Sequence, residues 1–551
     1  MSTLRIIEHD DRLRSLVLPT RVVLTKGQVE KWDNLLMEQP LMMHFNEEHL
    51  ATLDNRGGNE KAGILLDYGR ELHGGIRLVC PQAAPGAKLH IRFGESATEA
   101  LTPLGVKNTT NDHAVRDFTV DVPWLSDQEF GQTGFRFVYL ELEEPDTFVA
   151  LKAAVAVFVR RDLPYRGSFR CNDERLNTIF DTSAYTCHLC MQNYLWDGIK
   201  RDRLIWIGDS HPEMLTIRSV FGSQPILEES LERLRDGTPL PGWMNNMPSY
   251  SLWWLYILAD WYRYTGDRQF PDRQKDYILG LIDQLLARID DKGLMNLTDF
   301  FLDWPSNGKA DAITGVQALA VLAMEGATTL LALWEEPCRQ QKVSAAVEIM
   351  RRHIPNNTTY KPAVAMAYLA GMVTRDEAAT VLGENGVVGY STFMSYYLLT
   401  ATAKVLGMNT ALHNLRAYYG GMLDMGATTF WEDFHLEWTE GACPIDRLPQ
   451  DGEKDIHGDF GAYCYKGFRH SLCHGWSSGP VPFLLENVIG ISFDEPGGKR
   501  ITLTPDLGDL TWAEGTYPLP QGGELTVRCE KTANAVKTTY TAPDGVIVTV
   551  R

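Results

Sequence analysis

A run of helical patterns between residues 174 and 425 constrains the fold more than any other feature of this 551-residue chain. Apolar residues recur there at helical spacing, and the breaks between patterns carry capping side chains, Gly or Pro. The predicted helices cover roughly 174–193, 209–221, 225–235, 249–265, 272–289, 309–335, 339–353, 361–372, 375–382, 391–406 and 409–425, and a further one covers 480–489.

The predicted helices alternate in character. Residues 249–265 are apolar nearly all round and should be buried, whereas 272–289 are amphipathic and should lie outside. About a dozen helices that alternate in this way predict a ring of paired inner and outer helices, the (α/α)6 barrel. A stacked solenoid of helical repeats is the competing architecture, and it ranks lower because the sequence shows no fixed-period repeat.

Strand patterns flank the helices on both sides. Residues up to about 165 contain short alternating segments separated by Gly, Pro and Asp, which predict a β-sandwich, and residues after 491 alternate again. Glu71, His73 and Glu95 fall in the first part and are expected to have structural roles. The predicted organisation is multidomain: an N-terminal β-sandwich at 1–165, an (α/α)6-barrel catalytic domain at 166–490 and a small C-terminal β domain at 491–551.

Composition limits the partners. The net charge of −19 argues against nucleic acid and anionic membranes. No window approaches eighteen uninterrupted apolar residues, so no membrane-spanning helix is expected. The first residues show no apolar signal segment, and the nine scattered cysteines fit reduced thiols, so we expect a cytoplasmic protein. The oligomeric state stays open, a homo-oligomer included.

The segment 196–209 concentrates charge and aromatic surface. It reads Trp-Asp-Gly-Ile-Lys-Arg-Asp-Arg-Leu-Ile-Trp-Ile-Gly-Asp and leads from one predicted helix into the next. Most charge clusters are solvated loops. Indole flanked by carboxylates can also bind a sugar, with one ring face stacked and the hydroxyls hydrogen-bonded. Residue chemistry alone leaves these two interpretations evenly balanced.

Three further segments between predicted helices combine acids, aromatic residues or histidine. They contain Asp303 and Trp304, Trp431 and Glu432, and His474. Taken singly, Asp303 and Glu432 fit simple caps, and His474 fits a buried core histidine. Four such loops at one end of a barrel favour glycoside hydrolysis, which needs one protonated and one ionised carboxyl group across the glycosidic bond.

Other catalytic templates do not fit. The sequence has no G-x-S-x-G, no Walker A, no H-E-x-x-H and no G-x-G-x-x-G that opens a helix after a strand. His211 and His435 lack partners at metal-ligand spacing, and the pair Cys187 and Cys190 stands alone inside a helical pattern. We therefore expect no catalytic metal.

These segments resemble glycoside hydrolase family seventy-eight, the inverting α-L-rhamnosidases. The resemblance is carried most specifically by Asp197-Gly-Ile-Lys-Arg-Asp202 through Trp206-Ile-Gly-Asp209, by Thr429-Phe-Trp-Glu432, and by His474-Gly-Trp-Ser477. Residues 68–71 and 93–96 resemble strands of the family's N-terminal domain. The likeness covers most of the chain and implies the same order of sandwich, barrel and small β domain.

The resemblance also implies roles. Glu432 matches the family's general base, and Asp202 stands where the family's general acid is usually a glutamate, one methylene longer. The matching substrate-binding positions are Asp197, Arg201, Trp206, Asp209, Asp303, Trp304, Trp431 and His474. The implied reaction is hydrolysis of terminal α-L-rhamnosyl residues from small rhamnosides by single displacement, without metal or organic cofactor.

Two alternatives remain. The first is an inverting glycosidase for another deoxy- or unsaturated sugar, because ring substituents are recognised by loop geometry. The second is a catalytically retired sugar-binding protein on the same scaffold, for which the Asp at position 202 is the only support. In each case the expected partner is a small carbohydrate or glycoconjugate.

Overall fold

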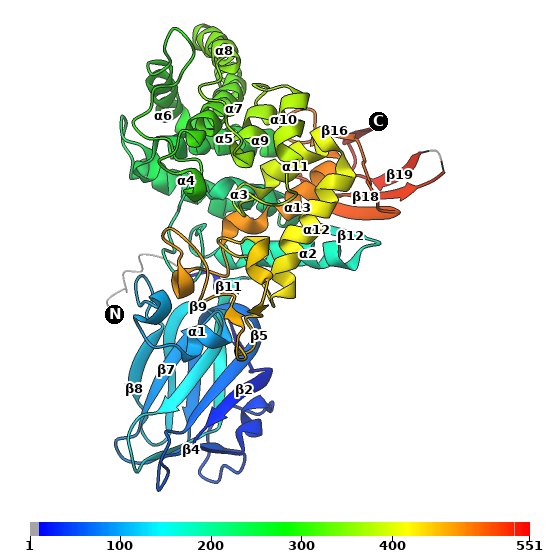
Figure 1. The fold of residues 1–551 in the computed structure, drawn as a ribbon. Helices are drawn as coiled ribbons and strands as arrows, with labels where there is room; N and C mark the ends of the chain where they lie inside the picture. The colour runs from blue at the N-terminus through cyan, green and yellow to red at the C-terminus, as the bar shows by residue number, and fades with distance from the viewer. Residues whose placement is uncertain (1–9, 534) are drawn as a thin grey trace, which may run out of the picture.

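A computed structural model of the protein describes residues 10–533 and 535–551. A strand-rich part, blue to cyan in Figure 1, lies at one end of the molecule, and the helices, green to yellow, lie above it. The last strands, in red, lie beside the helices. The order of strand-rich, helical and strand-rich segments along the chain follows the sequence patterns.

The first part consists of two sheets around one core. Its elements are β1 (Arg12–Val17), β2 (Arg21–Lys26), β3 (Gln28–Glu30), β4 (Ala51–Asp54), β5 (Gly63–Cys80), β6 (Gln82–Ala83), β7 (Lys88–Gly94), α1 (Ala97–Leu101), β8 (Asp117–Asp121), β9 (Ser126–Leu142), β10 (Phe148–Leu151) and β11 (Ala153–Arg161). One sheet has the order β1-β11-β5-β9-β7-β8 with β2 on β5, and the other has the order β3-β4-β10-β6. Ile64 and Leu140 of the first sheet share a buried cluster with Leu53 and Val149 of the second, so the sheets pack face to face.

The helical part follows the predicted boundaries to within a few residues. Its helices are α2 (Glu174–Cys190), α3 (Ser210–Val220), α4 (Pro225–Asp236), α5 (Pro248–Thr265), α6 (Gln269–Leu286), α7 (Asp311–Leu333), α8 (Pro337–Arg352), α9 (Lys361–Leu369), α10 (Arg375–Leu382), α11 (Ser395–Leu406), α12 (Met408–Asp424) and α13 (Pro480–Phe483). Helix α13 is shorter than the helix predicted at 480–489, because a π-helical turn follows it.

Six of these helices form a closed cycle of contacts. Helix α3 packs against α5, α5 against α7, α7 against α9, α9 against α11, α11 against α13, and α13 against α3. Helices α4, α6, α8, α10 and α12 alternate with them along the chain. Loops that precede the inner helices consequently meet at one end of the ring.

Helices α5 and α6 illustrate the local causes. Pro248 opens α5, where a missing N–H costs nothing, and Gly266 ends it at φ 63, a conformation that glycine adopts without strain. Trp253, Trp254 and Trp261 of α5 are fully buried. Helix α6 instead keeps one polar face, as the alternation of inner and outer helices requires.

Helix α7 bears on the expectation that this chain has no membrane-spanning helix. It is long and apolar enough to cross a membrane by length and composition, although no eighteen-residue stretch of it is uninterrupted. Within the described residues it is the one such helix, and 61% of its most apolar window is buried inside the fold. An uninterrupted apolar run is therefore too strict a criterion, and the packing identifies α7 as a core helix.

The C-terminal strands pack against the helices and take in one earlier segment. The elements are β15 (Ile491–Phe493), β16 (Arg500–Leu503), β17 (Trp512–Pro518), β18 (Glu524–Lys531), β19 (Val536–Thr541) and β20 (Ile547–Val550). Strand β12 (Ser168–Cys171) pairs with β17, although its residues fall inside the predicted barrel domain. The alternation of residues 168–171 is too short to reveal a partner more than 300 residues away.

Candidate active site

A cavity of about 170 Å³ opens at the end of the ring where the inner helices begin. Its lining consists of Asp197, Arg201, Asp202, Trp206, Asp209, Asn245, Met247, Tyr250, Phe301, Trp304, Glu432, Cys464, His474 and Trp476. All four segments singled out in the sequence contribute to it. Every predicted site residue lines it except Asp303 and Trp431.

Backbone hydrogen bonds hold three of the contributing loops together. Gly198 and His474 form an antiparallel bridge, and the N–H of Gly475 donates to the carbonyl of Asp197 at 2.7 Å. The N–H of Glu432 donates to the carbonyl of Ser471 at 3.0 Å. The loop before α3, the segment after α12 and the loop before α13 therefore form one unit.

Glu432 is buried and held at every polar atom. One carboxylate oxygen accepts from Nη2 of Arg201, and the other accepts from the N–H of Ser471 at 3.1 Å. Its backbone carbonyl accepts from the indole of Trp476 at 3.0 Å and from the hydroxyl of Thr392 at 2.6 Å. Because these hydrogen bonds hold both the side chain and the backbone of Glu432, they fix the direction of its carboxylate.

Asp202 lies on the more open side of the cavity, with 17% of its side chain exposed against 4% for Glu432. Its carboxylate accepts from Nη1 of Arg201 at 3.0 Å and from the indole of Trp206 at 3.1 Å. Arg201 thus bridges the two carboxylates on which the sequence prediction rests. Burial opposes a charge on Arg201, but the carboxylates of Glu432 and Asp202 outweigh it and raise the guanidinium pKa.

An unusual turn presents Asp202 to the cavity. Asp202 and Arg203 both have left-handed backbones, with φ of 54° and 55°, a conformation that costs non-glycine residues about 1–3 kcal/mol each. The strand-rich part holds this turn: Arg203 donates to the carbonyls of Gln132, at 3.0 Å, and of His113. The N–H of Asp202 also donates to Nδ1 of His113 at 2.9 Å. The sequence offered no signal for His113.

Three buried groups form the deep end of the cavity. Nε2 of His474 lies 3.8 Å from Asp197, 3.9 Å from Asp209 and 3.8 Å from Glu432. Burial, reinforced by neighbouring carboxylates, raises the pKa values of Asp197 and Asp209 well above their usual range. Burial and the Arg201 cation lower the pKa of His474. Burial thus favours the neutral form of each of these three groups.

Aromatic rings form the walls. Trp206 meets Tyr250 edge to face with centroids 6.1 Å apart, and Phe301 meets Trp304 in the same way at 5.3 Å. On the deep side, the rings of His474 and Trp476 lie 4.2 Å apart. Rings at several angles around a small polar pocket suit a ring-shaped ligand with hydroxyl groups.

Asp303 and Trp431 do not reach the cavity. Both are 1% exposed. Asp303 accepts hydrogen bonds from the Ser306 hydroxyl, at 2.6 Å, and from Tyr360, and it caps the short helix at 304–306. Trp431 packs edge to face on Phe434. The helix cap that the sequence allowed for Asp303 is present.

The cavity includes residues that the sequence did not single out: Asn245, Met247, Tyr250, Phe301, Cys464 and Trp476. Trp476 belongs to a quoted segment and could have been chosen for its proximity to His474. Tyr250 lies in the first turn of α5, a largely buried helix in which an aromatic residue looks like part of the core. Its hydroxyl donates to Asp209 at 3.1 Å, a contact that only the fold reveals.

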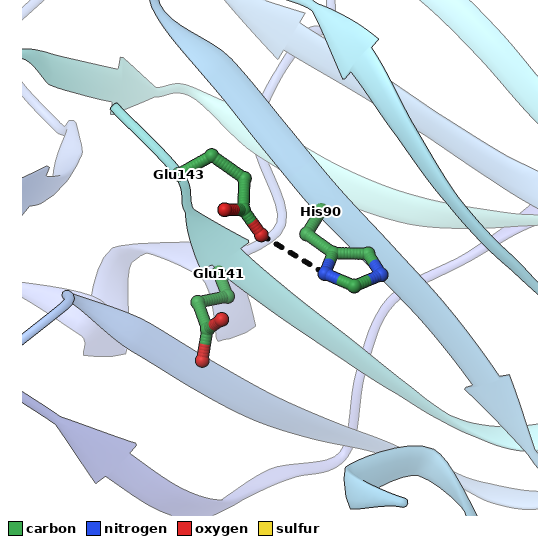
Figure 2. Close-up of side chains that lie close together, drawn as sticks. All are labelled: His90, Glu141 and Glu143. Carbon is green, nitrogen blue, oxygen red and sulfur yellow. Dashed lines mark hydrogen bonds and ion pairs between the residues drawn. The ribbon is translucent and has the colours of Figure 1, made fainter. Parts of the chain in front are cut away.

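Among the residues that the structure describes, two clusters away from this cavity have the composition of a metal site. In Figure 2, Nδ1 of His90 bonds to Glu143, at 2.9 Å, beside Glu141. The other ring nitrogen contacts Asp117, so both nitrogens are already engaged. The second cluster is Glu95, Glu99 and His457, into which Lys200 places its ammonium group, 2.9 Å from Glu99. A cation of the protein thus already balances these carboxylates.

Comparison with known families supports the predicted resemblance. Residues 164–323 match the family model described as bacterial alpha-L-rhamnosidase 6 hairpin glycosidase domain. Comparison with curated protein sequences finds no match.

Solved structures share the fold. The rhamnosidase of family GH78 from Bacillus sp. GL1 has a TM-score of 0.73 and 24% identity, with 94% of this chain and 55% of that chain covered. The Klebsiella oxytoca rhamnosidase with rhamnose bound has a TM-score of 0.66 and 18% identity, with 86% of this chain and 96% of that chain covered. The Streptomyces avermitilis α-L-rhamnosidase complexed with L-rhamnose has a TM-score of 0.69 and 15% identity, with 99% of this chain and 51% of that chain covered.

The resemblance to the α-L-rhamnosidases of glycoside hydrolase family seventy-eight is confirmed by the family model and by these neighbours. The chain spans about half the length of the Bacillus and Streptomyces proteins. At these identities the likeness to solved structures establishes the fold.

Proposed function

We propose that this chain is an inverting glycoside hydrolase that removes terminal α-L-rhamnosyl residues from small rhamnosides. The observation that carries the proposal is the pair Asp202 and Glu432, which face one small aromatic-walled cavity and share Arg201. The family likeness of the loop that supplies Asp202 and Arg201 supports the sugar and the reaction. The cycle of six inner helices supports the assignment of an (α/α)6 barrel with the two strand-rich parts as separate domains.

In the proposed mechanism Glu432 is the general base. Arg201 and the N–H of Ser471 hold its carboxylate in place, and the carboxylate removes a proton from a water molecule that attacks the anomeric carbon. Asp202 donates a proton to the departing oxygen from the opposite side. Inversion requires the two carboxyl groups to stand roughly 6.5–9.5 Å apart in the substrate complex, which leaves room for the water.

The greater exposure of Asp202 supports this division of roles. The leaving group must depart toward solvent, so the acid belongs at the open side and the base at the buried side. Asp197, Asp209 and His474 then bind sugar hydroxyls at the deep end, where a neutral carboxyl group can both donate and accept a hydrogen bond. Trp206 and Trp304 provide ring surface for stacking.

Leaving-group dependence tests the acid. Asp202→Asn should lower kcat by about 10²–10⁴ on an alkyl α-L-rhamnoside, whose oxygen needs a proton, and by much less on a 2,4-dinitrophenyl rhamnoside. Glu432→Gln should lower kcat similarly on both substrates, because the base acts on the water. Glu437→Gln, at an exposed position close in sequence, should match wild type.

If Asp202→Asn and Glu432→Gln both keep wild-type turnover, the assignment of acid and base is wrong. The same assay with a panel of aryl glycosides distinguishes rhamnose from another deoxy- or unsaturated sugar. Sugar binding without turnover of any glycoside would instead support a retired scaffold.

A further inference from the structure

A second cavity, of about 390 Å³, lies between helices α3, α5 and α11 and the C-terminal strands β15 and β17. This rear cavity shares no lining residue with the candidate active site. Its size falls in the range of about 300–1,000 Å³ that is usual for small-molecule sites, and such sites favour junctions between domains.

An ion-pair network faces the rear cavity. Arg218 contacts Asp260 at 3.0 Å and Glu486 at 2.7 Å, and the hydroxyl of Tyr396 donates to Glu486 at 2.7 Å. The side chains of Asp260 and Glu486 are each 16% exposed. Arg263 and Lys404 also line the cavity, so acidic and basic groups present acceptors and donors side by side, as the hydroxyl groups of a polar ligand require.

One buried donor in this cavity has only a long contact with its protein partner, Asp260. His211 is 1% exposed, and its Nδ1 bonds to the hydroxyl of Tyr397 at 2.6 Å. Its Nε2 lies 3.5 Å from Asp260 and makes no hydrogen bond to any described residue. Buried polar atoms of folded proteins are nearly always hydrogen-bonded, so this weakly bonded atom has room for a closer ligand acceptor.

Aromatic faces complete the cavity. Tyr256 stacks on His211 with centroids 4.6 Å apart and an interplanar angle of 20°. Tyr264 stacks on Phe493, at 5.8 Å and 24°. Flat faces beside paired donors and acceptors match a ring with apolar faces and hydroxyl groups at its edge.

We propose that the rear cavity binds a small neutral polyhydroxylated ring of the monosaccharide class, at a site separate from the hydrolytic one. Asp260 and Glu486 accept hydrogen bonds from its hydroxyls, His211 donates to a ring substituent, and Tyr256 covers one ring face. This proposal does not depend on rhamnoside hydrolysis, which uses the other cavity.

Calorimetric titration with L-rhamnose, D-glucose, D-galactose and myo-inositol tests the proposal on the full chain. The background is Trp206→Ala, which removes a wall of the hydrolytic cavity. At least one probe should still bind. Adding Tyr256→Ala should weaken that binding at least tenfold, whereas Tyr256→Phe, which keeps the ring, should leave it within twofold.

Asp260→Asn should weaken the same probe at least tenfold, and melting curves show whether each variant is folded. The proposal is overturned if no probe binds the Trp206→Ala protein, or if folded Tyr256→Ala and Asp260→Asn proteins bind as well as their parent. Binding of inorganic phosphate in place of the neutral rings also overturns it. Rhamnoside hydrolysis by the Tyr256 variants separates this result from the proposed activity.

Discussion

Asp209 shows how one buried residue couples the candidate site to stability. Its carboxyl group accepts from the hydroxyl of Tyr250 and is 3% exposed. Burial raises its pKa well above the usual 3.8, and the charges of Glu432 and Asp202 add to this, although the bond from Tyr250 opposes it. The folded chain therefore keeps a proton that the unfolded chain releases near pH 3.8.

The higher pKa of Asp209 in the folded chain determines the direction in which stability changes with pH. A carboxyl pKa raised by folding gives stability that is complete below the unfolded pKa and declines as pH rises toward the folded pKa. Asp209→Asn keeps an oxygen that accepts from Tyr250 but has no proton to lose. Its melting temperature relative to wild type should therefore rise as pH increases from about 4 to about 8.

Melting curves at several pH values measure this difference. Asp291→Asn, at an exposed position, serves as the control and should follow wild type throughout. A constant difference between Asp209→Asn and wild type over this pH range would contradict the assignment of a raised pKa.

At the scale of elements, the end of strand β7 supports the loop that precedes α13. Glu95 follows β7, and its carboxylate accepts from the N–H of Leu472 at 2.7 Å and from the hydroxyl of Ser471 at 3.3 Å. Lys200 lies 3.3 Å from Glu95 and donates to the carbonyl of His470 at 2.9 Å. Since Ser471 in turn binds Glu432, the strand-rich part helps to place the proposed base.

Glu95→Gln should therefore lower kcat about tenfold, because a hydrogen bond to a charged group is worth about 1.5–3 kcal/mol and the amide keeps part of it. Kinetics on an aryl α-L-rhamnoside measure the effect. Glu514→Gln, in an exposed pair with Arg528, is the matched control. Equal kcat values for the two variants would show that Glu95 does not position the loop.

At the scale of the whole molecule, Asp67 and Arg136 join the strand-rich part to the helical part. Arg136 forms two bonds to Asp67, at 2.8 and 3.0 Å, and donates to the carbonyl of Gly426 at 3.1 Å. Arg21 also pairs with Asp67 and donates to the carbonyl of Asp446. One buried carboxylate thus orients two cations that reach across the boundary.

Arg136→Leu should uncouple the two parts. Breaking a buried ion pair costs about 3–5 kcal/mol, so differential calorimetry should show a lower and broader or divided unfolding transition. Arg77→Leu removes a partly exposed pair with Asp127 and should cost at most about 1 kcal/mol. Identical thermograms for the two variants would show that Arg136 does not couple the parts.

The periodic segments could be predicted from sequence, because helix boundaries depend on nearby residues. Pro248 and Gly266 bracket α5 within one residue of the predicted ends. The meeting of Asp202 with Glu432 followed from a resemblance that already contained the tertiary contact. His113 and the rear cavity could not be predicted, since each depends on pairings between residues far apart in the chain. The pairing of β12 with β17 could not be predicted for the same reason.

The depth of the candidate active site has a consequence for the order of events after bond cleavage. Asp197, Asp209 and His474 are at most 4% exposed, while Asp202 stands nearer the entrance. In the proposed reaction the aglycone lies outside the sugar and must leave first. The monosaccharide then escapes by the route through which the next molecule arrives, so free sugar delays each new cycle and turnover slows as the product accumulates.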